Sequence, residues 1–187
     1  MKNTILRIIN ENRKTMLDLA GEADKISKLG KIACAAYRKG GKLVFFGNGG
    51  SASDAQHLAT EMVCRFKKNR KSLPALALTV NTSLLTATAN DFSFDRIFSR
   101  QVESLVTPKD VVIGISTSGS SPNVLSGIKE ARKIGAYTAG LTGSKDTKLH
   151  KRTNLCIRIP STDTARIQEG HILVGHILCE LIEDALF

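Results

Sequence analysis

Apolar residues fall into two patterns along this chain: helical stripes and short, uninterrupted runs. In residues 4–39 they recur at helical spacing, which predicts two helices with a break near Gly21 and Asp24. Gly40 and Gly41 predict the end of this segment, because glycine commonly follows the last turn of a helix. The two expected stripes consist of Ile5, Ile8, Ile9, Met16 and Leu19, and of Ile26, Leu29, Ala33 and Ala36.

Five of the short apolar runs lack polar alternation, which is typical of strands buried on both faces of a parallel sheet. These runs are residues 42–46, 75–79, 111–115, 138–142 and 155–159. Between and after them, helical spacing predicts helices over 52–66, 84–89, 94–105, 122–134 and 164–186. The alternation predicts an α/β fold, a doubly wound sandwich of five parallel strands with an N-terminal helical extension, of the flavodoxin or Rossmann type. We expect a single domain over residues 1–187, with helices in 1–40 and the sandwich in 41–187.

Local capping signals support the helix at 122–134. Ser121 is a favourable N-cap, Pro122 suits the first helical position, and Gly135 suits the position after the last turn. The helix expected at 164–186 has apolar residues almost all the way round. Such a helix is normally buried, which in a small domain requires a second subunit against it. We therefore expect an oligomer.

The composition is that of an ordinary globular protein, since 42% of the 187 residues are hydrophobic and 24% are charged. No apolar run is long enough to cross a bilayer, and the N-terminus lacks the apolar segment of a secretory signal, so we expect a soluble cytoplasmic protein. The four cysteines are widely spaced without a C-x-x-C pair, which excludes a zinc ribbon and fits reduced thiols. Tryptophan is absent and aromatic residues are few, which argues against a surface for stacking bases.

Lysine and arginine outnumber the acidic residues by 27 to 17, which gives a formal net charge of +10. This excess favours anionic partners such as phosphorylated metabolites or nucleic acid. The densest basic cluster, residues 65–71, is interpreted mainly as the solvated end of the preceding helix, because cations stabilise a helix C-terminus. The other basic residues are scattered over expected helix surfaces, a distribution that does not favour nucleic acid.

Two loops that follow expected strands have the composition of ligand-binding loops, and ligands of open α/β sheets bind beyond the carboxyl ends of the strands. Residues 47–51, Gly-Asn-Gly-Gly-Ser, would let backbone amides approach a ligand, although a tight strand-to-helix turn explains them equally well. They match neither the dinucleotide fingerprint nor a P-loop. The second loop places five hydroxyls around one glycine at a helix N-terminus, which favours a phosphate site over an ordinary polar turn. These hydroxyls belong to Ser116, Thr117, Ser118, Ser120 and Ser121.

Few residues could supply acid/base chemistry, because the chain has only four histidines. His57 and Glu61 lie four residues apart and therefore on one face of the helix after the glycine-rich loop. His171 and His176 lie on the last helix with Gln168, where polar groups need partners or a function if they are buried. A divalent metal held by His57, Glu61 and groups of the last helix is chemically reasonable, although a structural role is the commoner fate of such a His/Glu pair.

Taken in order, these motifs resemble those of the phosphoheptose isomerases, enzymes of the sugar isomerase (SIS) domain family. The resemblance rests on Gly-Asn-Gly-Gly-Ser-Ala-Ser-Asp-Ala-Gln-His at 47–57, Asn-Asp-Phe at 90–92, Ser-Arg-Gln-Val at 99–102, Ser-Thr-Ser-Gly at 116–119 and Arg-Ile-Gln-Glu-Gly-His at 166–171. It covers essentially the whole chain, including the N-terminal helices.

The resemblance implies an isomerase that converts sedoheptulose 7-phosphate into D-glycero-D-manno-heptose 7-phosphate, the first step towards the ADP- or GDP-heptose of bacterial surface polysaccharide. It implies Glu61 and His176 as the acid/base pair of an enediol mechanism. It also implies one zinc ion per active site, held by His57, Glu61, Gln168 and His176, and a cytoplasmic homotetramer with active sites at subunit interfaces. It does not account for the net charge of +10.

The resemblance also implies the substrate contacts. Ser116, Thr117, Ser118 and Ser121 would hold the phosphate. The other implied contacts are Asn48, Gly49, Gly50, Ser51, Glu61, Arg65, Asn90, Asp91 and Gln168.

Two alternative functions remain open on the sequence. Some SIS-domain tetramers bind the bacterial replication initiator and need no acid/base pair, so the presence of Glu61 and His176 favours an enzyme. Other SIS isomerases act on pentose or hexose phosphates; the N-terminal helices and the Gln168 and His176 pattern favour a heptose.

Overall fold

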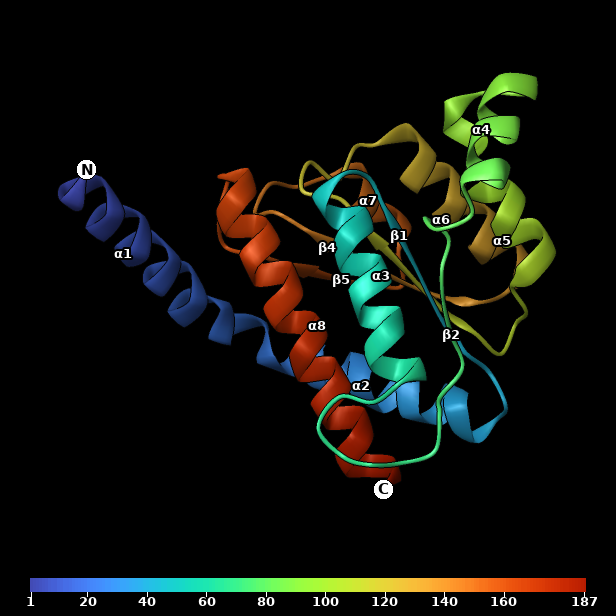
Figure 1. Ribbon diagram of the computed structural model, residues 1–187, viewed down its shortest axis with the longest axis horizontal. Coiled ribbons are helices and arrows are strands. Elements are labelled where there is room, and N and C mark those ends of the chain that lie inside the picture. Colours follow the sequence, from blue (N-terminus) through green and yellow to red (C-terminus); the bar gives the residue numbers. More distant parts are fainter.

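The central element of the protein is a five-stranded, all-parallel sheet in the order β2-β1-β3-β4-β5. The computed structural model describes all residues, 1–187 (Figure 1). The strands are β1 (Leu43–Gly47), β2 (Ala75–Ala77), β3 (Val111–Ile115), β4 (Tyr137–Thr142) and β5 (Leu155–Arg158). Starting from β1, the chain adds β2 on one side and β3, β4 and β5 on the other. The predicted doubly wound fold is therefore confirmed. Gly47 pairs with Ile115 at the carboxyl ends of these two strands, which places the glycine-rich and hydroxyl-rich loops side by side.

Helices cover both faces of the sheet (Figure 1). They are α1 (Lys2–Asp18), α2 (Ala23–Arg38), α3 (Gly50–Val63), α4 (Thr82–Asp91), α5 (Ser99–Leu105), α6 (Pro122–Ile134), α7 (Lys148–Arg152) and α8 (Thr164–Leu186), with 3-10 turns at Leu19–Glu22 and Phe94–Arg96. Successive side chains of a strand point to opposite faces, so the sheet contributes side chains to two hydrophobic cores, one on each face. Phe45 belongs to the core shared with α2, α3 and α8, and Phe46 to the core shared with α5 and α6.

The first helix extends away from the body of the molecule (Figure 1). Of its expected apolar stripe, Leu19 is buried and Met16 packs against the core, but Ile5 and Ile9 are 57% and 56% exposed. The outer half of α1 therefore presents an apolar stripe without a partner in the single chain. No helix of the protein is both long and apolar enough to span a membrane.

The structure corrects the interpretation of the basic cluster. Helix α3 ends at Val63 rather than at 66, and the following residues form an irregular segment. The amides of residues 66–68 bind the carboxylate of Glu183 instead of continuing the helix. The cluster is therefore not part of the helix. Arg70 does donate to two carbonyls in the last turn of α3, as expected for a cation at a helix C-terminus, but its side chain is buried rather than solvated. The sequence also did not predict the short helix α7.

Candidate active site

The two ligand loops are tied together by a pair of asparagines. Asn48, directly after β1, and Asn123, in the first turn of α6, exchange reciprocal side-chain hydrogen bonds of 2.9 and 2.8 Å. Asn123 is only 1% exposed, and its Oδ1 also accepts from the amide of Val124 at 2.9 Å. This pairing fixes the glycine-rich loop against the start of α6. Sequence reasoning missed Asn123, because its partner lies 75 residues away.

Three of the five hydroxyls of the second loop converge. Ser116 Oγ lies 3.0 Å from Ser121 Oγ and 3.5 Å from Ser118 Oγ. The loop turns at Gly119, whose φ of +59° favours glycine, and its amide donates to Ser116 Oγ at 3.2 Å. Ser120 is exposed, and its hydroxyl donates to the carbonyl of Ser118. Three hydroxyls therefore face one another at the start of α6, a suitable arrangement for an oxyanion.

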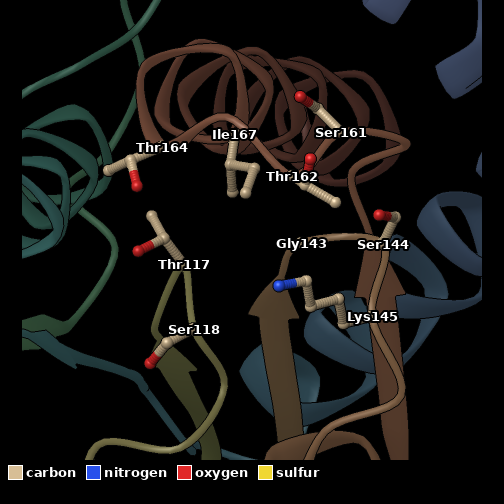
Figure 2. Close-up of a pocket in the computed structure, with 9 residues that line it drawn as sticks. All are labelled: Thr117, Ser118, Gly143, Ser144, Lys145, Ser161, Thr162, Thr164 and Ile167. Carbon is tan, nitrogen blue, oxygen red and sulfur yellow. The ribbon is translucent and has the colours of Figure 1, made fainter.

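A cavity of about 240 Å³ opens beside this loop, between the ends of β3 and β4 and the first turn of α8 (Figure 2). Lys145 extends into it from the loop after β4, towards the side formed by Thr117 and Ser118 (Figure 2). No carboxylate lines the cavity, and Lys145 makes no ion pair. Its full lining is Thr117, Ser118, Gly143, Ser144, Lys145, Ser161, Thr162, Thr164 and Ile167. One ammonium among hydroxyls suits an anionic, polyhydroxylated ligand.

The candidate acid/base and metal-binding residues meet where α3 and α8 touch; His57, Glu61 and His176 are called the reactive cluster below. Nε2 of His57 lies 2.9 Å from Nε2 of His176 and 3.2 Å from Oε1 of Glu61. The three ligand atoms all lie within 4.8 Å of one another. The close approach of the helices depends on Gly175, because a Cβ there would overlap the side chain of Leu58. The structure thus brings His176, which the resemblance implied, to the His/Glu pair that the sequence places on one face of α3.

This cluster fits a divalent metal such as zinc. Ligand atoms bound at about 2.0–2.1 Å in a tetrahedral zinc site lie about 3.4 Å apart, close to the separations seen here. Two imidazole nitrogens at 2.9 Å cannot both present lone pairs to each other without a proton or a cation between them. Two nitrogens and a carboxylate oxygen are a donor set that zinc and related ions prefer.

Gln168 does not join these three ligands in the single chain. Its amide lies against Gly50, in the first turn of α3, where an added Cβ would overlap it. Gln168 precedes His176 by eight residues on α8, which corresponds to about 12 Å along a helix axis. Gln168 therefore lies at the level of the glycine-rich loop, while His57, Glu61 and His176 lie two turns further down.

Most of the remaining candidates are exposed. Asn90 and Asp91, at the end of α4, hydrogen-bond to each other at 2.9 Å. Arg65 follows α3 and makes no side-chain hydrogen bond or ion pair. Gly49 and Ser51 flank the start of α3, where Ser51 is buried.

Two further titratable groups lie near these elements: Asp54, which sequence reasoning missed, and His171, which was among the histidines considered for acid/base chemistry. One carboxylate oxygen of Asp54, on α3, is buried without a hydrogen-bond partner, and burial raises its pKa to about 6 against the opposing effect of His57. His171 is fully buried on α8, its ring nitrogens have no hydrogen-bond partner of good geometry, and burial lowers its pKa to about 4. Asp54 adds negative charge beside the reactive cluster, whereas His171 is a neutral core residue.

The polar motif at the start of α8 serves packing as well as the site. Arg166 pairs with Glu169 one turn later, and Glu169 also accepts from Asn12 of α1 at 2.7 Å. These contacts tie α1 to α8. They also give Arg166 and Glu169, two polar residues at the start of a largely apolar helix, hydrogen-bonding partners.

Comparison with known proteins agrees with this geometry. The sequence model of the SIS domain matches residues 9–143, and the chain belongs to the SIS domain family. Phosphoheptose isomerases of Paramagnetospirillum magneticum and Rhodospirillum rubrum are 58% and 53% identical to it, each over 88% of this chain and over 85% and 87% of their own length. Within the SIS family, the chain thus belongs to the phosphoheptose isomerases, which are sugar-phosphate isomerases.

Solved structures lead to the same family. A phosphoheptose isomerase from Francisella tularensis superposes with a TM-score of 0.94 at 32% identity, covering 97% of both chains. The phosphoheptose isomerase of Neisseria gonorrhoeae superposes with a TM-score of 0.93 at 35% identity, covering 98% of both chains. The agreement extends over the N-terminal helices as well as the sheet.

Proposed function

We propose that this protein converts sedoheptulose 7-phosphate into D-glycero-D-manno-heptose 7-phosphate in the cytoplasm. The product would enter the ADP- or GDP-heptose route to bacterial surface polysaccharide. The observation that carries the proposal is the cluster of His57, Glu61 and His176, because it places a carboxylate and an imidazole together in a chain of the phosphoheptose isomerase family. A non-catalytic binding protein would need neither group.

The reaction moves a carbonyl from C2 to C1 of the sugar through an enediol. Glu61 takes the proton from C1 as the carbonyl oxygen at C2 is protonated, and a proton is then delivered to C2 as the C1 hydroxyl loses its own. His176 transfers the protons of the two oxygens through Nδ1, because its Nε2 faces His57 and Glu61. Zinc held by His57, Glu61 and His176 would polarise the sugar oxygens when bound. A carboxylate has two oxygens, so Glu61 can face a metal with one and receive a proton on the other.

The phosphate is held by Ser116, Thr117, Ser118 and Ser121, and the sugar chain by Asn48, Gly49, Gly50, Ser51 and Gln168. These residues lie at the carboxyl end of the sheet, about 12 Å along α8 from the level of His176. We therefore place each active site between subunits of a homotetramer, where the loops of one chain meet the reactive cluster of another. Arg65, Asn90 and Asp91 are exposed and available to such a site, and Gln168 could complete the metal coordination of a neighbouring chain.

A substrate panel tests the reaction. The purified zinc-loaded protein is given sedoheptulose 7-phosphate, ribulose 5-phosphate and fructose 6-phosphate, and the aldose products are measured. We expect kcat/KM for the heptose to exceed the others by at least about 100-fold, since a site built for buried hydroxyls discriminates strongly against analogues that lack them. Comparable rates with a shorter sugar would assign the site to that sugar instead.

Mixed oligomers test the shared active site. Two inactive variants, Glu61→Gln and Ser121→Leu, are co-expressed with different tags and the mixed species is purified. If each site takes its loops from one chain and its cluster from another, about a quarter of the sites combine two intact halves and activity returns. Mixtures of Glu61→Gln with His176→Gln are the control and stay inactive, because both changes affect the same cluster. No recovery in the first mixture would place the whole site within one chain.

A further inference from the structure

A buried ion pair lies directly behind the reactive cluster. Nε of Arg70 lies 3.0 Å from Oε1 of Glu183, and each side chain is only 1% exposed. Removing two charges from water is costly, and the cost is offset only if their remaining hydrogen-bonding groups find partners. Here those partners are backbone groups that flank the reactive residues.

Arg70 binds the end of the helix that carries Glu61. It donates from Nη2 to the carbonyl of Glu61 at 2.7 Å and from Nη1 to the carbonyl of Met62 at 2.6 Å. Helix α3 ends at Val63, so both carbonyls belong to the last turn, where carbonyls lack partners within the helix and a cation is favourable. The guanidinium therefore fixes the turn on which Glu61 sits.

Glu183 binds the segment that follows α3. Its carboxylate accepts from the amides of Phe66 at 3.0 Å, Lys67 at 2.9 Å and Lys68 at 2.9 Å. Burial by itself would raise the pKa of Glu183, but these amides and Arg70 hold it at about 2. The group is thus a fixed anion at neutral pH, seven residues after His176 on α8.

The segment bound by Glu183 covers His176. The ring of Phe66 stacks on the imidazole of His176, with centroids 5.4 Å apart and planes inclined by 26°. Because Glu183 accepts from the Phe66 amide, it holds the backbone from which this ring projects. The helix that carries His176 therefore also positions the ring that packs on it.

We propose that Arg70 and Glu183 are positioning residues for the reaction: Arg70 orients Glu61, and Glu183 orients His176 through Phe66. Neither residue touches the substrate. The expected kinetic effect rests on the proposed roles of Glu61 and His176, whereas the expected effect on the Phe66 ring does not.

A neighbouring ion pair provides a matched control. Lys67 Nζ lies 2.7 Å from Oε2 of Glu180 and joins the same segment to the same helix, but the two side chains are 60% and 49% exposed. Exposed pairs of this kind contribute little. Lys67 Nζ also lies 5.6 Å from the centroid of the Phe66 ring, so the pair is broken from its other side. Glu180→Gln removes the exposed ion pair and leaves Lys67 and the buried contacts in place.

Steady-state kinetics with sedoheptulose 7-phosphate test the proposal. We expect Arg70→Lys, Glu183→Gln and Phe66→Leu to lower kcat by about 10- to 100-fold, since a displacement of about 1 Å can cost that much. KM should stay within about threefold in these variants, because the phosphate loop is separate from the pair. Glu180→Gln should keep the wild-type constants. Arg70→Lys keeps the positive charge, but an ammonium group lacks the planar array of N–H donors with which the guanidinium binds Glu183 and the carbonyls of Glu61 and Met62 at the same time.

A second measurement does not require turnover. The chain contains no tryptophan, so Phe66→Trp introduces a single tryptophan over His176, whose emission can be excited selectively at long wavelength. Adding Glu183→Gln to this background should shift the emission to longer wavelength and increase quenching by acrylamide, while adding Glu180→Gln, which leaves Lys67 in place, should change neither. If the wild type does not isomerise the heptose, this measurement still tests the positioning.

Two results would overturn the proposal. One is wild-type kcat and unchanged probe emission in folded Arg70→Lys and Glu183→Gln variants. The other is loss of folding in both of these variants together with wild-type kcat in Phe66→Leu. Either result would reduce the buried pair to a purely stabilising contact.

Discussion

Asn48 and Asn123 hold the two ligand loops together through their side-chain amides, with each residue acting as donor and acceptor at 2.9 and 2.8 Å. The pair bridges the point between β1 and β3 where the strand order reverses, which is where ligands bind in doubly wound sheets. The glycine-rich loop and the phosphate loop therefore form one rigid surface rather than two independent turns.

Replacing Asn123 by alanine should weaken both folding and substrate binding. The change leaves the amide of Asn48 without its partner, which should lower the free energy of unfolding by about 1–3 kcal/mol. KM should rise by about tenfold, because the glycine-rich loop is no longer held against the start of α6. Urea unfolding and steady-state kinetics measure these effects, with exposed Asn69→Ala as the control. A wild-type KM in Asn123→Ala would show that the pair does not organise the site.

The phosphate loop should distinguish between two adjacent serines. Ser121→Ala removes a hydroxyl that lies 3.0 Å from Ser116 Oγ, whereas Ser120→Ala removes an exposed one bonded to a backbone carbonyl. We expect KM to rise by about 10-fold in Ser121→Ala, as for loss of one hydrogen bond to a charged group, with little change in Ser120→Ala. Inhibition by inorganic phosphate should weaken in parallel. Equal effects of the two substitutions would contradict this assignment.

The metal site should depend on His57 but not on His150. The protein should bind one zinc ion per chain, as measured by elemental analysis and by competition with a chromophoric chelator. Removing a residue that only hydrogen-bonds to a metal ligand typically weakens metal binding by about 10- to 100-fold. His57 would be a ligand itself, so His57→Gln should weaken zinc binding by more than that. His150→Gln is the control, since His150 is paired with Asp146 at 2.9 Å on α7. Zinc binding that survives His57→Gln would place the ion elsewhere.

The buried His171 should make stability depend on pH. Its pKa is lowered by burial to about 4, so between that value and about 6.5 the unfolded chain binds a proton that the folded chain does not. This contribution to stability is therefore complete above pH 6.5 and is lost as the pH falls towards 4, by at most about 3 kcal/mol.

Urea unfolding between pH 4.5 and 7.5 measures this effect as the difference between the wild type and His171→Gln. The raised pKa of Asp54 has the opposite slope in the same range, but it is common to both proteins and drops out of the difference. The wild type should lose stability more steeply than the variant as the pH falls. Parallel curves would show that His171 is not buried in the neutral form.

The sequence predicts those parts of the fold that depend on local signals. Helix α6 begins at Pro122 and ends at Ile134 as the capping residues indicate, and Gly135 adopts a φ of +92°. By contrast, the basic residues after α3 were assigned to a helix end because the anion that binds this segment, Glu183, lies more than 110 residues away. No local pattern contains that partner.

The candidate site divides in the same way. The spacing of His57 and Glu61 places them on one helix face, and the five hydroxyls within six residues predict a phosphate loop. The contributions of Asn123 and Phe66 depend on which elements pack together in three dimensions. The addition of His176 came from family resemblance, and the packing of α3 on α8 through Gly175 gives its physical reason.

The most direct test of the whole account is the turnover of sedoheptulose 7-phosphate by the wild type beside Glu61→Gln and His176→Gln, with the oligomeric state of each verified by light scattering. Proton transfer by a positioned side chain contributes about 10²- to 10⁴-fold, so each variant should lose at least about 100-fold in kcat while keeping the oligomer of the wild type. No turnover by a folded, zinc-loaded wild type, or activity within about tenfold of wild type in both variants, would contradict the assignment of these two residues as the acid/base pair of a heptose phosphate isomerase.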